Sequence, residues 1–319
     1  MKTLQWLLQI AVTVILLYLA WQQIELDTLG KVLQNADFRP LLLVPFLLVA
    51  DLWVNSYRIY SLYKFFNVRV KVLKVIWVKL QGMFFSLIFP LVGDAYKIQS
   101  FKNIYGASYG KNSVVVLLDR LIYAFALTII LVPVSWLGLL QLPLVIKLAL
   151  TSLLLLELAI LVIVNKPGWH KNWISKLKKI YPRLPDLDAD YTARKGFARE
   201  VVLNTLVALV RHHIMALIYL CVAFALLQGF AHHYLTFVIT VFFIMLSRVI
   251  PVSIGGIGLR EYIAVVLFPQ MGIASETAFS IALIVSTITI LQALIGGGSF
   301  LGHKLDALFN KKDVRHAKQ

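Results

Sequence analysis

A succession of apolar stretches, each about as long as a helix that crosses a lipid bilayer, constrains this chain more than any other feature. One helical crossing needs about 20 mostly apolar residues. Charged residues make up only 14% of the 319 residues, against roughly 25% in soluble globular domains. We therefore predict an all-α polytopic membrane protein that forms a single membrane domain over residues 1–319. The predicted spans cover residues 4–24, 41–63, 113–140, 144–164, 201–227 and 278–301.

The charged residues lie mainly in the gaps between the apolar stretches. The formal net charge is +16, and the gap after the second span carries Lys64, Arg69, Lys71 and Lys74 without an acidic residue. Because Lys and Arg are retained on the cytoplasmic side of a membrane, this gap should face the cytoplasm, and both termini with it. We predict a multi-pass protein of the cytoplasmic (inner) membrane. No basic patch lies on a separate folded domain, so we expect no nucleic-acid partner.

The longest polar stretch, residues 166–199, is a predicted cytoplasmic loop between a first half, 1–165, and a second half, 200–302. It holds nine Lys or Arg residues against three Asp. Aromatic and aliphatic residues recur in it at helical spacing, which predicts an interfacial amphipathic helix. A basic tail, 303–319, follows the second half.

Each half contains one apolar segment that Pro and Gly interrupt. In the first half, the segment at 75–97 is short, and basic residues flank both of its ends. A segment that begins and ends on one side of the membrane must re-enter, so we predict a buried helical hairpin. The second hairpin, 248–270, would enter from the opposite side. The predicted fold has about six to eight transmembrane helices and two broken hairpins, arranged as an inverted repeat.

Broken segments at matching places of two inverted halves indicate a substrate site near the middle of the bilayer. We expect helices to begin after Gly93 and Gly258, where free N–H groups favour an anion such as phosphate. Lys97 and Arg260, a turn or less into those helices, add positive charge, and Asp94 suits an N-cap. The alternative that Pro and Gly only kink ordinary helices stays open. The predicted substrate-binding residues are Pro90, Gly93, Asp94, Lys97, Asp119, Arg120, Arg248, Pro251, Gly255, Gly256, Gly258, Arg260 and Glu261.

Further ionisable residues lie inside the apolar stretches, where such residues usually mark function or tight pairing. We interpret Asp119 and Arg120 as a buried pair at the border of the cavity, with simple packing as the alternative. Arg58, near the cytoplasmic end of its span, is expected to snorkel to the membrane surface. Two histidines follow Arg211, but adjacent histidines point to different helix faces, so we expect no metal site. The other residues of this kind are Asp51, Lys79, Glu157 and Arg248.

Motifs of catalysis are not recognisable in the sequence. No hydrolase, nucleotide-binding or metalloprotease motif occurs in a suitable strand or helix context. The longest polar stretch is also too short for a conventional active-site domain. We therefore predict that the chain is not an enzyme and needs neither a cofactor nor a metal.

Three motifs resemble a known family. They are P-x-x-G-D-x-x-K from Pro90 to Lys97, the pair Asp119-Arg120, and P-x-x-x-G-G-x-G-x-R-E from Pro251 to Glu261. In these motifs and their order the chain resembles the transmembrane, flippase-like region of lysylphosphatidylglycerol synthases. The family pattern usually has Arg in place of Lys97 and Glu in place of Asp119. Lys keeps the charge but not the bidentate grip of Arg on phosphate.

The resemblance implies that the protein moves a polar-headed lipid between the two leaflets of the membrane. The partner would be a membrane lipid with an anionic or phosphate-bearing head group. The two-domain enzymes of this group carry a soluble aminoacyl-transferase domain after the membrane region. Because this sequence ends at Gln319 without such a domain, we expect no lysyl transfer.

A second interpretation gives the protein no transport function. The chain would then be a membrane subunit that docks a separate glycosyl- or aminoacyl-transferase through the basic loop at 166–199. A flippase would keep its activity in vitro without this loop, whereas a docking subunit would lose its partner. A third interpretation, an intramembrane enzyme that acts on lipid, lacks a recognisable pair of nucleophile and base.

Overall fold

The computed structural model of the chain describes residues 2–165, 196–227, 234–247, 249 and 256–316. These residues form helices joined by short links, and no strand occurs among them, which confirms the predicted all-helical class. The elements are α1 (Lys2–Trp21), α2 (Leu26–Gln34), η1 (Arg39–Leu43), α3 (Val44–Phe65), α4 (Val72–Ile88), α5 (Pro90–Tyr105), α6 (Tyr109–Trp136), α7 (Leu144–Asn165), α9 (Phe197–Leu226), α10 (Tyr234–Leu246), α11 (Leu259–Leu267), η3 (Phe268–Met271) and α12 (Ser275–His316).

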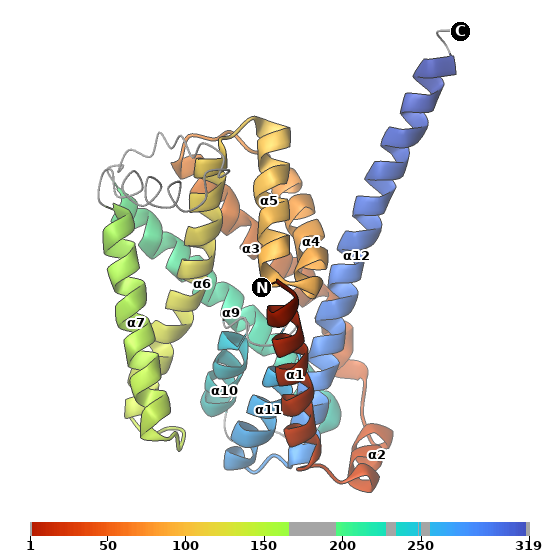
Figure 1. Ribbon diagram of the computed structural model, residues 1–319. Coiled ribbons are helices and arrows are strands. Elements are labelled where there is room, and N and C mark those ends of the chain that lie inside the picture. The colour runs from red at the N-terminus through yellow and green to blue at the C-terminus, as the bar shows by residue number, and fades with distance from the viewer. Residues whose placement is uncertain (1, 166–195, 228–233, 248, 250–255, 317–319) are drawn as a thin grey trace.

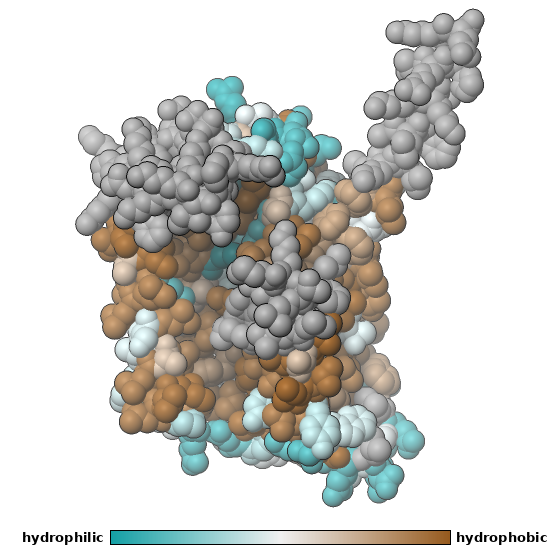
Figure 2. All heavy atoms as spheres, in the orientation of Figure 1, coloured by the Kyte–Doolittle hydropathy of each residue, from teal (hydrophilic) through white to brown (hydrophobic). Residues whose placement is uncertain are grey.

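On the face of the body that Figure 2 shows, an apolar band lies between two hydrophilic rims. Exposed hydrophobic side chains such as Phe46, Leu144 and Leu155 belong to the long outer helices α3 and α7. Exposed apolar side chains on outer helices are typical of a protein that lipid surrounds, because lipid offers the backbone no hydrogen bonds and only helices with apolar surfaces are stable there.

Within the described residues, five helical segments are long and apolar enough to cross a membrane, and shorter apolar helices accompany them. The sequence predicted about six to eight spans. Among the described residues, the shorter apolar helices are Ile10–Trp21, the later part of α1, and Tyr234–Leu246 of α10. The five segments are Arg39–Phe65, Tyr109–Trp136, Leu144–Asn165, Phe197–Leu226 and Ser275–Gly302.

Two helical hairpins enter the body from opposite sides (Figure 1). The hairpin of α4 and α5 occupies the upper half in this view, and α10 and α11 lie in the lower half. Each is followed by a left-handed glycine, Gly106 (φ 65°) and Gly272 (φ 78°), and then by a long helix, α6 or α12. The two hairpins thus lie in opposite halves of the body, and the second begins at Tyr234 of α10, earlier than the predicted segment 248–270.

The first hairpin turns at Phe89, whose backbone is extended, and α5 begins at Pro90. The prediction that this helix begins after Gly93 was wrong. Proline suits the first position of a helix because its fixed φ is already helical and its missing N–H would have no helical partner. The helix then runs to Tyr105, well beyond the predicted end of the hairpin.

Between the first two predicted spans lie the short helix α2 and the start of η1. A helix of nine residues with charged side chains cannot cross a bilayer, which is why a search for apolar runs does not find it. Most of the predicted amphipathic helix within 166–199 lies outside the described residues.

The sidedness of the protein remains a prediction from its charges. α3 and α7 end, and α9 begins, at the upper face of Figure 1, the face beyond which α12 projects. The basic gap after α3 is on this face, so the charge rule places the face in the cytoplasm. α1 begins partway down the body, and the cytoplasmic position of the N-terminus therefore rests on the sequence alone.

Close helix packing fixes the positions of the two hairpins. A Cβ atom at Gly296 of α12 would collide with the backbone of Leu80 in α4, and one at Gly297 would collide with the Phe84 ring. Small residues allow such close approach between membrane helices. In the second hairpin, α10 is apolar and its residues 237–246 are all buried, as expected for a helix that protein surrounds.

Candidate functional site

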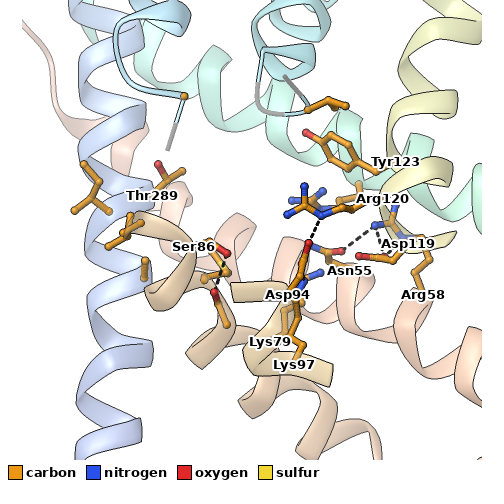
Figure 3. A pocket seen from close by; sticks show the side chains of 18 of the residues that line it. Asn55, Arg58, Lys79, Ser86, Asp94, Lys97, Asp119, Arg120, Tyr123 and Thr289 are labelled. Carbon is orange, nitrogen blue, oxygen red and sulfur yellow. Dashed lines mark hydrogen bonds and ion pairs between the residues drawn. The ribbon is translucent and has the colours of Figure 1, made fainter. Parts of the chain in front are cut away.

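A cavity of about 350 Å³ lies between the two hairpins. Its volume is in the range of small-molecule sites, about 300–1,000 Å³. Figure 3 shows charged side chains from several helices gathered around it. The lining residues come from α3, α4, α5, α6, α9, the second hairpin and α12 and are Asn55, Arg58, Lys79, Gly82, Met83, Ser86, Leu87, Asp94, Lys97, Asp119, Arg120, Tyr123, Arg211, Val249, Gly256, Ile257, Arg260, Thr289, Ile290 and Ala293.

The described wall of the cavity has an excess of positive charge. Six of the lining residues are basic and two are acidic, a formal excess of four positive charges. Ionisable groups at membrane depth are costly and mark substrate pathways or tight pairing. The basic residues are Arg58, Lys79, Lys97, Arg120, Arg211 and Arg260, and the acidic ones are Asp94 and Asp119.

Arg58 of α3 forms a buried ion pair with Asp119 of α6. Its Nε and Nη2 atoms donate to Asp119 Oδ1 at 2.9 and 2.6 Å, and the arginine is only 1% exposed. The prediction that Arg58 snorkels to the surface was wrong. α3 directs this side chain toward α6. There, the Asp119 carboxylate accepts the hydrogen bonds that water would accept at the membrane surface.

Asp94 of α5 joins two basic side chains. Its Oδ1 lies 2.6 Å from Lys97 Nζ, and its Oδ2 forms an ion pair with Arg120 Nε of α6 (Figure 3). Asp94 is the fifth residue of α5 and not an N-cap, contrary to the prediction, because the helix begins earlier, with Phe89 as its N-cap. Lys97 is consequently about two turns into the helix.

Asp119 and Arg120 both line the cavity but do not pair with each other as predicted. Consecutive helical residues point about 100° apart, so Asp119 faces α3 and Arg120 faces α5. The same geometry separates Arg211 from its neighbour His212 in α9. Arg211 Nε donates to Asp51 Oδ1 at 2.9 Å, whereas His212 Nε2 lies 3.1 Å from a backbone carbonyl of α6.

The second hairpin holds its charges differently. α11 begins after Gly258 as predicted, and Glu261 accepts hydrogen bonds from Gly258 N–H at 2.7 Å and from the Ser286 hydroxyl at 2.5 Å. Arg260 lines the cavity, and its Nε donates to the Gly256 carbonyl at 3.3 Å. Glu261 is therefore a cap directed toward α12.

The structure brings together some of the predicted binding residues and separates others. Pro90 begins α5 at the turn of the first hairpin. Glycine at 93 serves close packing, because a Cβ atom there would collide with Ser86 and with the Gly82 carbonyl. Gly93, Gly258 and Glu261 do not line the cavity. Arg248, Pro251 and Gly255 lie outside the described residues. The predicted residues that line it are Asp94, Lys97, Asp119, Arg120, Gly256 and Arg260.

Arg58 was assigned to the membrane surface, and six other polar lining residues were not among the predicted binding residues: Asn55, Lys79, Ser86, Tyr123, Arg211 and Thr289. The sequence feature that could have identified Lys79, Arg58 and Arg211 as site residues is a charged side chain inside an apolar stretch. No described group of three or more His, Cys, Asp or Glu side chains is arranged to hold a metal ion.

These features define a polytopic helical membrane protein with a positively charged cavity between two inverted hairpins. Over residues 6–297, the chain matches the family described as the lysylphosphatidylglycerol synthase TM region. The chain therefore belongs to this family, which confirms the resemblance of its motifs. No curated protein and no solved structure matches the chain.

Proposed function

We propose that the protein binds a membrane lipid with a phosphate-bearing head group in the cavity and moves it between the leaflets. The observation that carries the proposal is the excess of basic side chains around a cavity inside a membrane-spanning body. Buried positive charge without enough carboxylates favours an anionic ligand. Arginine, which supplies four of the six basic residues, matches phosphate geometry.

The size and position of the cavity favour a head group as its occupant. Its volume of about 350 Å³ suits a head group, so the lipid tails would remain in the bilayer. Figure 2 shows hydrophilic atoms set back in a hollow of an otherwise apolar side of the body. A lipid that reaches this hollow from the side keeps its tails in hydrocarbon.

In this proposal, Lys97, Arg120 and Arg260 contact the phosphate. Asp94 and Asp119 hold basic side chains of the cavity in place when no lipid is bound. We assign the chain no catalytic residue and no cofactor, and we place it in the cytoplasmic membrane with both termini inside. A docked transferase would contact the loop at 166–199, of which residues 166–195 lie outside the described ones.

The test measures lipid movement in proteoliposomes with fluorescent phosphatidylglycerol and phosphatidic acid, read by the fraction that a membrane-impermeant quencher reaches. Arg260→Gln should slow translocation by about tenfold or more, because it removes a charge-assisted contact. Arg39→Gln is the control, since the Arg39 side chain is 90% exposed and lies outside the cavity. Unchanged translocation by a folded Arg260→Gln variant would remove this residue from the proposed site.

A further inference from the structure

On the cavity side chains, one buried nitrogen of Arg58 and the amine of Lys79 have no partner among the described residues. Arg58 Nη1 makes no hydrogen bond, although the other two nitrogens of this guanidinium do. No hydrogen bond or ion pair within the described part of the chain involves Lys79, which is 8% exposed. Charged donors are costly to bury without a partner, so both point to a ligand that supplies acceptors.

The electrostatic surroundings of Lys79 are mostly positive. Arg58, Lys97 and Arg211 are close enough to repel it, and Asp119 is the nearby carboxylate that attracts it. Asp119 is itself bonded to Arg58. One carboxylate therefore neutralises only one of two neighbouring cations. The remaining positive charge favours the binding of another anion beside Lys79.

The charge balance indicates how strongly charged this anion is. Asp51, which does not line the cavity, pairs with the lining residue Arg211. Counting it with Asp94 and Asp119 leaves six described basic residues against three carboxylates, a formal excess of three positive charges. A phosphodiester carries one negative charge, whereas a terminal phosphate carries about −1.5 to −2 at neutral pH. A diphosphate carries more.

We propose that the cavity takes a lipid whose head group ends in a phosphate or diphosphate, in preference to a phosphodiester lipid. This inference rests on the proposed function and names its substrate class. A terminal phosphate offers three acceptor oxygens, which can accept from Arg58 Nη1, from Lys79 Nζ and from a third lining cation. A head group that carries a lysyl cation would meet like charges here and bind more weakly.

The test compares lipids with identical acyl chains, bound to the purified full-length chain in nanodiscs and quantified by native mass spectrometry. We expect phosphatidic acid to bind about tenfold or more tightly than phosphatidylglycerol, and lysylphosphatidylglycerol to bind most weakly. Lys79→Met should bring the ratio of phosphatidic acid to phosphatidylglycerol close to one. Lys147→Met, on the outer helix α7 and away from the cavity, should leave this ratio unchanged.

Each alternative result has a distinct meaning. Equal or tighter binding of phosphatidylglycerol or lysylphosphatidylglycerol, lost in Arg260→Gln, would overturn the terminal-phosphate inference and keep the proposed lipid site. A preference for phosphatidic acid that persists in Lys79→Met would overturn the role of Lys79. Inorganic pyrophosphate is the soluble probe: if it binds in a Lys79-dependent way while no lipid binds, the ligand is a free anion and the proposed lipid function fails.

Discussion

The two hairpins border one cavity but control charge in different ways. In the first, Asp94 is held by side-chain cations on α5 and α6. In the second, Glu261 is held by a backbone N–H and a hydroxyl, and no ion pair to it occurs within the described residues. An anionic ligand can compete with Asp94 for its cations, whereas Glu261 has no cation to release among the residues that the structure describes. We therefore expect the ion pairs of Asp94, rather than the hydrogen bonds of Glu261, to rearrange when an anionic ligand binds.

Packing shows the same contrast. Near the turn of the first hairpin, Leu91 and Val92 are 59% and 41% exposed, whereas residues 237–246 of α10 are all buried. Exposed apolar side chains at membrane depth face lipid. The turn of the first hairpin thus faces lipid, whereas protein surrounds most of α10.

The substitution with the largest expected effect on this comparison removes Asp119, the buried carboxylate of α6 that pairs with Arg58. Asp119→Leu leaves Arg58 buried without its partner, and we expect the free energy of unfolding in detergent to fall by about 3–5 kcal/mol. Replacing both residues, as Arg58→Met with Asp119→Leu, should recover most of the loss. A double variant as unstable as Asp119→Leu alone would show that the ion pair is not the cause.

A second change tests the packing of the first hairpin on α12. Gly296→Ala places a Cβ atom against the backbone of Leu80, which cannot rotate away, and should cost about 1–3 kcal/mol of stability. Gly298→Ala is the matched control in the same helix, because nothing lies within 4 Å of its added Cβ. It should be neutral or stabilise by about 0.5–1 kcal/mol. Equal stability of the two variants would contradict the close contact.

The smallest expected effect is the difference in stability between alanine substitutions at one glycine after the first hairpin and one glycine within the second. Gly106 and Gly258 both have positive φ, 65° and 83°, so alanine strains the backbone at either position. At Gly258, the new Cβ would also lie 2.8 Å from the Thr13 carbonyl oxygen, whereas Gly106 has open space. Gly258→Ala should therefore lower the melting temperature further than Gly106→Ala, by an additional cost of about 1 kcal/mol. Equal shifts would mean that α1 moves aside.

Much of this fold could be predicted because its signals are local in the sequence. The long apolar runs indicate the spans, and Pro90 and the glycines near 256 mark the two breaks. The start of α11 after Gly258 was predicted correctly, whereas the start of α5 was not. In the first break, a helix can begin at Pro90 or after Gly93, and local propensity does not choose between these two starts.

Ion-pair partners could not be predicted in the same way. Arg58 and Asp119 are 61 residues apart, and Arg211 and Asp51 are 160 apart. Which charges meet depends on how α3, α6 and α9 are rotated about their axes, and apolar run length carries no information on that rotation. The adjacent pair Asp119-Arg120 suggested a local contact, but the helix directs the two side chains to different neighbours.

The sequence by itself determined that the chain spans a membrane, that it breaks once in each half, and that charges lie at these breaks. Composition and run length suffice for this, because burial of a helix in lipid depends on each segment's own apolarity. The tertiary structure alone decided which cations line the cavity, which carboxylates neutralise them, and that Arg58 Nη1 and Lys79 are left without a described partner. Those properties depend on distances between helices, which only the packing of side chains sets.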